Sequence, residues 1–213
     1  DQTYFLCQLN QNQLNNSLFP IGELTKPEVR QIAEELDLPV AHKKDSTGIC
    51  FIGERDFREF LKNYIPAKSG KMVDIVSKKV IGEHQGIMYY TIGQRKGLGI
   101  GGNGEPWFVV GKDYDKNILY IAQGDSNKWL LSHGALITDV NWVSETKPEG
   151  EYDCTAKFRY RQKDNDVSLH FIDDTTLYVT FKKPIKAVTP GQAAVFYDGD
   201  VCLGGGTIDK VYK

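Results

Sequence analysis

The chain has 213 residues, enough to bury about 70% of its unfolded surface without metals or cross-links. Hydrophobic side chains make up 40% and charged ones 25%, as in ordinary soluble domains. The 26 Lys and Arg against 28 Asp and Glu leave a net charge of −2. This charge argues against a nucleic-acid-binding surface that is basic all round, but not against a local basic stripe.

No apolar run approaches the ~20 residues that a membrane-spanning helix needs, and no charged-then-apolar leader is seen. The four cysteines are far apart and form no CxxC pair, so neither a structural zinc site nor a disulfide framework is expected. Sparse thiols suit a reducing cytosol. Because the chain begins Asp-Gln-Thr without a methionine, we expect a fragment or a processed chain.

Residues 1–66 carry the helical signal. The run "TYFLCQL" at 3–9 has strand character. Thr25 and Glu28 form a capping-box pattern with Pro27 in the first turn, which predicts a helix over 26–37, and a second helix is expected over 54–64. Strand and helix alternating in this way predict the tail of an α/β domain.

The rest of the chain is rich in short strand-like runs separated by turns. "WFVVGKDYDKNILYIAQG" predicts a hairpin around residues 113–117, and the regular strands of 130–213 predict a small antiparallel barrel. The run "CLGGG" at 202–206 predicts a bend or bulge within a strand. The glycine-rich stretch "GQRKGLGIGG" resembles a phosphate cradle but lacks a following lysine and helix, so a tight structural loop is favoured.

Cys50 follows a turn-forming stretch and precedes an expected helix, an environment that lowers a thiol pKa. Lys43 and Lys44 add positive charge nearby, while Asp45 opposes their effect. From the local sequence alone, a buried loop thiol packed beside Ile49, Phe51 and Ile52 is the favoured interpretation. Core positions are expected for the other three cysteines, Cys7, Cys154 and Cys202. Neither His42 nor His84 has the spacing of a metal ligand pair.

The segment "AKFRYRQK" predicts a strand with one charged face. Side chains alternate along a strand, so Lys157, Arg159, Arg161 and Lys163 would share one face over about 20 Å. Such a stripe matches the phosphate spacing of a nucleic acid. The solvated face of a barrel strand is the alternative.

Long stretches of the chain resemble the tRNA-specific 2-thiouridylase family. They are "FPIGELTKPEVRQIAEELDLPVAHKKDSTGICFIGERDFREFL", "GEHQGIMYYTIGQRKGLGIGG", "FRYRQ" and "AVTPGQAAVFYDGDVCLGGG". The resemblance implies an α/β remnant of a pyrophosphatase-type (adenine nucleotide hydrolase-like) domain at 1–66. It further implies a small β-rich central domain at 67–129 and a C-terminal antiparallel β-barrel at 130–213 that contacts tRNA.

The resemblance also implies a chemistry. Family members use ATP as a co-substrate to adenylate the C2 oxygen of the wobble uridine of tRNA, and a cysteine persulfide delivers sulfur to that carbon. Cys50 in "DSTGICFIG" matches the persulfide cysteine, loaded by a sulfur-carrier protein or a cysteine desulfurase. The matching tRNA contacts are Asp1, Gln2, Arg159, Tyr160, Arg161 and Gln192. No metal is implied.

Two family features have no match in these 213 residues. They are the ATP loop "SGGVDSS" and a second cysteine that forms a disulfide with the persulfide cysteine. We therefore expect the C-terminal part of a cytoplasmic sulfurtransferase that is inactive by itself. The alternative is an RNA-binding module without chemistry of its own.

Overall fold

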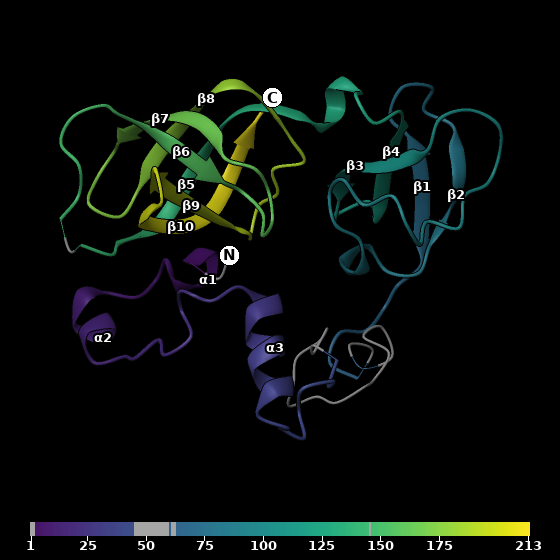
Figure 1. The fold of residues 1–213 in the computed structure, drawn as a ribbon. Coiled ribbons are helices and arrows are strands. Elements are labelled where there is room, and N and C mark those ends of the chain that lie inside the picture. The colour runs from purple at the N-terminus through teal and green to yellow at the C-terminus, as the bar shows by residue number, and fades with distance from the viewer. Residues whose placement is uncertain (1–2, 45–59, 61–62, 145) are drawn as a thin grey trace. The chain divides into compact units, whose positions relative to one another are not determined.

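The computed structural model describes residues 3–44, 60, 63–144 and 146–213 (Figure 1). The chain divides into two compact units. One consists of Asp1–Gln13 together with Ala67–Lys213, and the other of Leu14–Pro66. The first unit contains a four-stranded sheet and a closed barrel. Each unit is described by itself below.

The smaller unit contains the helix expected from the capping pattern. Helix α3 (Lys26–Glu35) begins after Thr25, whose backbone N–H and hydroxyl both donate to the Glu28 carboxylate, at 2.6 and 2.7 Å. The prediction is confirmed, although the helix ends two residues early. Asp37 adopts φ 50°, and the N–H of Leu38 donates to the Ala33 carbonyl at 2.9 Å. This left-handed residue closes the helix end in a Schellman arrangement.

The first residues do not form the expected strand. Residues Thr3–Leu6 form helix α1, and α2 follows at Gln11–Asn15. Tyr4 and Cys7, three residues apart, are both buried, so one helical face of the apolar run is covered. Among the described residues of 14–66 no strand is present, and most of the expected helix at 54–64 lies outside the described residues.

The four-stranded sheet has the order β2-β1-β4-β3. Its strands are β1 (Gly70–Asp74), β2 (Val80–His84), β3 (Trp107–Asp113) and β4 (Ile118–Gln123), with a 3-10 turn, η1, at Ile87–Tyr89. Strands β3 and β4 pair antiparallel, which confirms the predicted hairpin, whereas β1 and β4 pair parallel. Met72, Leu119 and Ile121 fill the core beneath the sheet.

The fully buried His84 supports this sheet. Its Nδ1 accepts a hydrogen bond from the Gly86 N–H at 3.2 Å, and its Nε2 lies 3.1 Å from the Asn117 carbonyl oxygen. The two partners select the neutral tautomer with the proton on Nε2. His84 therefore has a structural role in the turn between β3 and β4.

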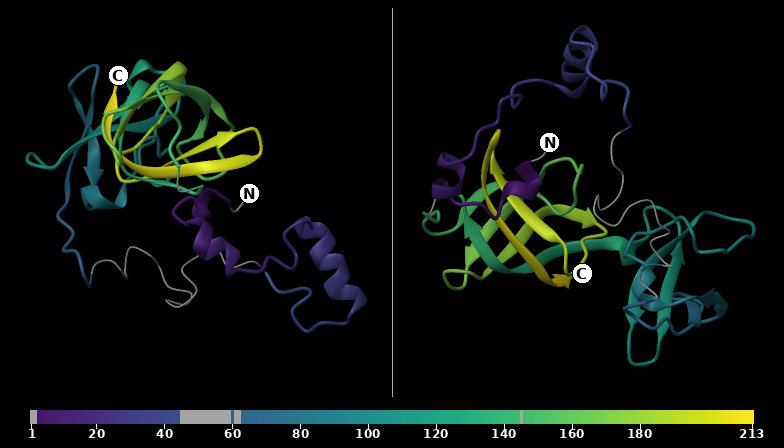
Figure 2. Two further views of the ribbon diagram at one scale, coloured as in Figure 1. Left: turned by 90° about the vertical axis from the view of Figure 1, so that its left-hand side faces the viewer. Right: turned by 90° about the horizontal axis from the view of Figure 1, so that it is seen from below.

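The remaining strands close a barrel in the order β10-β5-β8-β7-β6-β9, as predicted (Figure 2). After a second 3-10 turn, η2 (Lys128–Leu130), come β5 (Leu131–Trp142), β6 (Tyr152–Lys157), β7 (Asn165–Phe171), β8 (Leu177–Lys186), β9 (Ala193–Asp198) and β10 (Val201–Tyr212). Phe158, Phe196 and Leu169 are among the fully buried side chains of its interior. Closure leaves no free sheet edge in this barrel.

The glycine run at 202–206 lies in β10 at a bulge, as expected. The register with β9 shifts between Cys202 and Gly204. Gly204 has φ 153°, and a Cβ there would lie 2.0 Å from the Asn141 carbonyl oxygen. Only glycine permits this close approach of the two backbones.

Candidate nucleic-acid interface

The basic segment 157–163 is not one extended strand. Strand β6 ends at Lys157, and the chain turns over the next residues, with φ 65° at Arg161. The turn is closed by the Phe158 N–H, which donates to the Gln162 side-chain oxygen at 2.8 Å, while the Phe158 ring is fully buried. The prediction of a four-charge stripe on one face is therefore wrong, because a strand argument requires an unbroken extended backbone.

The charges of this segment have separate environments. The Lys157 ammonium lies 4.6 Å from the Tyr197 ring centroid and 3.6 Å from the Asp164 carboxylate. Arg161 is exposed and stacks over Tyr160, with its guanidinium carbon 5.3 Å from the ring centroid. Lys163 is exposed.

Arg159 is held within the protein. Its Nη2 donates to the Ile92 carbonyl and, at 3.1 Å, to the Thr189 hydroxyl. Ile92 follows the four-stranded sheet's 3-10 turn, whereas Thr189 lies between β8 and β9, so the guanidinium joins these two parts of the unit. Burial lowers the pKa of Arg159, and the nearby Tyr4 acts in the opposite direction.

A pocket of about 550 Å³ opens beside Arg159. It is lined by Tyr4, Phe5, Cys7, Gln8, Thr91, Arg159, Tyr160, Gln192 and Ala193. Three residues proposed from the resemblance, Arg159, Tyr160 and Gln192, thus meet at one place. Arg161 stacks on Tyr160, which lines the pocket.

Helix α1 forms one wall of the pocket because it is fixed to the barrel. The Tyr4 hydroxyl donates to the Ala193 carbonyl at 2.9 Å, and the Gln8 amide donates to the Gly205 carbonyl at 3.0 Å. The Asn141 amide donates to the carbonyl of Cys7 at 3.0 Å. Burial raises the pKa of Tyr4 to about 12, so its hydroxyl stays protonated and donates at neutral pH.

Three aromatic rings cluster at the pocket. The Phe5 centroid lies 4.7 Å from that of Tyr160 and 5.3 Å from that of Tyr4. Phe5 is 62% exposed and Tyr160 38%, whereas Tyr4 is buried. The pocket therefore combines exposed aromatic surface with a cation and an amide.

The sequence did not identify Tyr4, Phe5, Gln8 or Thr91 as pocket residues. Reading 3–9 as a helix would have placed Tyr4 and Cys7 on a buried face and left Phe5 outside it. No local signal joins Thr91 to Gln192, about a hundred positions later in the chain.

Several residues named from the resemblance lie outside the described residues. These are Cys50, Asp1 and Gln2. The other cysteines are free thiols, with Cys7 buried and Cys154 and Cys202 partly buried. Burial raises the pKa of Cys154 to about 12 and that of Cys202 to about 11, and it also raises that of Cys7. These thiols are therefore poor nucleophiles at neutral pH.

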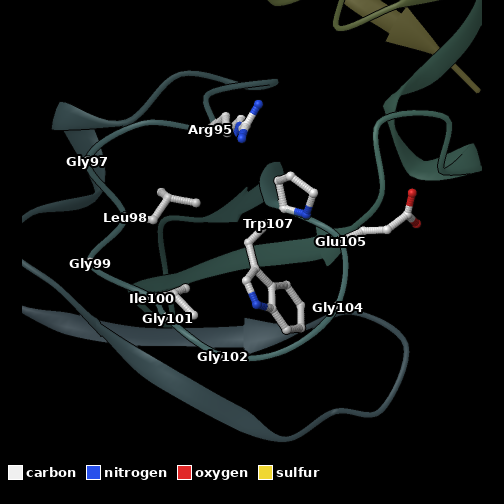
Figure 3. A pocket seen from close by; sticks show the side chains of 11 residues that line it. Arg95, Gly97, Leu98, Gly99, Ile100, Gly101, Gly102, Gly104, Glu105 and Trp107 are labelled. Carbon is white, nitrogen blue, oxygen red and sulfur yellow. The ribbon is translucent and has the colours of Figure 1, made fainter.

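The glycine-rich loop borders a second pocket, of about 450 Å³ (Figure 3). Gly99 and Gly102 have φ 67° and 122°. The loop leads into strand β3 at Trp107, so no helix N-terminus is available to hold a phosphate. Figure 3 shows the Trp107 indole beside the loop. The charged side chains of this pocket are those of Arg95 and Glu105.

Three family models match successive parts of the chain. They are described as the tRNA methyl transferase HUP domain (residues 1–54), the tRNA methyl transferase PRC-barrel domain (58–123) and the aminomethyltransferase beta-barrel domain (132–208). A tRNA-specific 2-thiouridylase MnmA from Bacillus cytotoxicus is 59% identical over all 213 residues. The chain belongs to the tRNA-specific 2-thiouridylase family. The resemblance found in the sequence is confirmed.

The 2-thiouridylase relatives are longer than this chain. The proteins of that name from Bacillus cereus and Bacillus anthracis are each 58% identical over the whole chain. The chain spans 57% of the length of these relatives. The family models support a HUP-domain part followed by a PRC-barrel and a β-barrel domain; the adenine nucleotide hydrolase-like character of residues 1–66 stays a prediction.

In the part of the chain that the structure describes, no helix has the length and apolar character that a membrane span requires. The same residues contain no group of His, Cys, Asp and Glu side chains arranged to hold a metal ion.

Proposed function

We propose that this chain is the sulfur-carrying and tRNA-binding portion of a tRNA-uridine 2-sulfurtransferase that makes 2-thiouridine at the wobble position. The observation that carries the proposal is 59% identity over the whole chain to a relative named a tRNA-specific 2-thiouridylase. The pocket shared by Arg159, Tyr160 and Gln192 supports it, because guanidinium, aromatic and amide groups are the side chains that RNA-binding sites use.

In the proposed reaction the C2 oxygen of the uridine attacks the α-phosphate of ATP, the co-substrate, so that an adenylate forms and pyrophosphate leaves. The terminal sulfur of a Cys50 persulfide attacks C2 and AMP leaves with the oxygen. A second thiol then attacks Cys50 and breaks its S–S bond, so that both electrons remain on the sulfur that becomes the thione and a disulfide forms. The raised pKa values of Cys154 and Cys202 make them unsuited to that second role.

We assign the tRNA contacts to Asp1, Gln2, Arg159, Tyr160, Arg161 and Gln192. Arg161 is exposed and is the cation of this set that is best able to meet a phosphate. Arg159 uses its Nη2 within the protein, and its buried Nε has no hydrogen-bond partner among the described residues.

The remaining assignments follow from the same proposal. Residues 1–66 belong to the catalytic domain, 67–129 to the central domain and 130–213 to the tRNA-contacting barrel. The sulfur donor is a sulfur-carrier protein or a cysteine desulfurase, and the protein works in the cytoplasm. Because these residues lack an "SGGVDSS" loop, we expect no thiolation by the 213-residue chain alone.

The chemistry is tested in a protein of the relatives' full length, with tRNA, ATP and a sulfur donor. Cys50→Ser should abolish sulfur incorporation, whereas Cys202→Ser, which changes a free thiol of the barrel, should retain it. Normal thiolation by Cys50→Ser would disprove the assignment and leave the RNA-binding module as the function.

RNA binding is tested separately by titrating tRNA at several salt concentrations. Arg161→Ala should lower the dependence of log K on log salt by about 0.7–0.9, the contribution of one phosphate contact. Lys79→Ala, an exposed cation in the β1–β2 turn, is the matched control and should leave the slope unchanged. Equal slopes for both variants and the unmodified chain would contradict the assignment of Arg161.

A further inference from the structure

Phe5 is an exposed aromatic side chain on a fixed support. It is 62% exposed although it neighbours the buried Tyr4 in α1. The helix cannot turn to bury it, because the Tyr4 hydroxyl and the Gln8 amide hold α1 to Ala193 and Gly205 of the barrel. A large apolar ring held in water has a cost, and such rings on a rigid support are typical of binding sites.

Tyr160, the ring next to Phe5, already contacts a cation. Tyr160 lies 4.7 Å from Phe5, centroid to centroid, and carries the Arg161 guanidinium 5.3 Å from its centroid. The two planes of Phe5 and Tyr160 are tilted by 44°, so they are not stacked on each other. The aromatic surface available to a ligand is therefore chiefly that of Phe5, with a cation close by.

Two polar groups of the same pocket lack partners. The Gln192 Oε1 and the Arg159 Nε are buried and have no hydrogen bond within the described part of the chain. The Gln192 backbone is fixed, since its N–H donates to Thr189 and its carbonyl accepts from Ile208 at 2.8 Å. Gln192 is one of the residues that line the pocket, so its amide belongs to the pocket wall.

We propose that this pocket binds a single unpaired nucleobase of RNA, which stacks on Phe5 while Gln192 hydrogen-bonds to its edge. Tyr160 and its stacked Arg161 form the adjoining wall, where Arg161 meets the phosphate of the same nucleotide. Aromatic stacking accepts any base, whereas the amide supplies a donor and an acceptor to distinguish base edges. The inference rests on the proposed function, which makes RNA the ligand.

The experiment uses the 213-residue chain and an anticodon stem-loop RNA in which one loop position at a time is 2-aminopurine. Stacking quenches this base, so the unmodified chain should quench one loop position on binding. Phe5→Leu keeps an apolar side chain but removes the ring. It should abolish that quenching and raise Kd at least about fivefold, the fold-change that corresponds to ~1 kcal/mol of lost stacking.

Matched variants separate stacking from structure. Phe5→Tyr retains the ring and should retain both quenching and affinity, and Tyr114→Leu removes an exposed ring outside the pocket and should change neither. The Phe5→Leu loss should be equal at all salt concentrations, because stacking releases no counterions.

The outcomes for the two proposals differ. If the unmodified chain binds the RNA and Phe5→Leu binds and quenches equally well, the stacking inference is overturned while the proposed function stands. If the unmodified chain does not bind the RNA at all, the proposed RNA-binding function fails and the inference fails with it.

Discussion

Replacing Arg159 by alanine tests whether this cation mainly stabilises the fold, as a clamp that joins Ile92 to Thr189. The substitution removes the hydrogen bonds from Nη2 to the Ile92 carbonyl and the Thr189 hydroxyl. Hydrogen bonds from charged donors contribute about 1.5–3 kcal/mol each. Thr189 keeps its bond to the Ala187 carbonyl, and Arg159 is only partly buried. We therefore expect the free energy of unfolding to fall by about 3–4 kcal/mol, the lower end of the summed range.

Urea denaturation followed by tryptophan fluorescence measures this change. The three tryptophans, Trp107, Trp129 and Trp142, all lie in the unit that contains Arg159, so the signal reports on that unit alone. Lys163→Ala removes an exposed cation four residues away and should stay within about 0.5 kcal/mol of the unmodified chain. If Arg159→Ala unfolds at the same urea concentration as Lys163→Ala, Arg159 is not a clamp.

Three further predictions concern other parts of the chain. At pH 7.5 iodoacetamide should label Cys50 before Cys202, because the pKa of Cys202 is raised to about 11; equal rates would contradict a primed carrier thiol. Gly204→Ala places a Cβ against a β5 carbonyl at φ 153° and should cost more than about 2 kcal/mol in urea denaturation, whereas an unchanged midpoint would refute the bulge geometry. The hydrogen bonds from Thr25 lower the pKa of Glu28, so their stabilisation of α3 is present above the unfolded pKa and is lost as the pH falls through the folded one. Circular dichroism should show this loss in the unmodified chain and a smaller loss in Thr25→Ala, which removes the hydroxyl donor but keeps the backbone N–H donor.

The barrel was predictable because its signals are local. The turns that follow β5, β7, β8 and β9 are marked by Pro, Gly or Asp residues, and the strand-like runs between them leave few other architectures. The bulge at 202–206 was predictable for the same reason, since several glycines within a strand indicate a close backbone approach.

The pocket was not predictable because its parts are brought together by distant contacts. The run at 3–9 has strand propensity, yet its hydrogen bonds join Tyr4 to Ala193 and Gln8 to Gly205. Tertiary packing overrides local propensity in such a segment. The alternation argument for the basic segment failed because β6 ends at Lys157 and the chain then turns, with a positive φ at Arg161 that no composition rule indicates.

The first thirteen residues belong to the same compact unit as everything from Ala67 onward. The stretch Leu14–Pro66, which carries Cys50 in its sequence, is consequently an insertion in the chain of the larger unit, and both of its ends join that unit. Lengthening such an insertion has a small entropic cost, since each doubling of a closed loop costs only about 0.6 kcal/mol. Changes in the length of residues 14–66 should therefore cost the larger unit little stability.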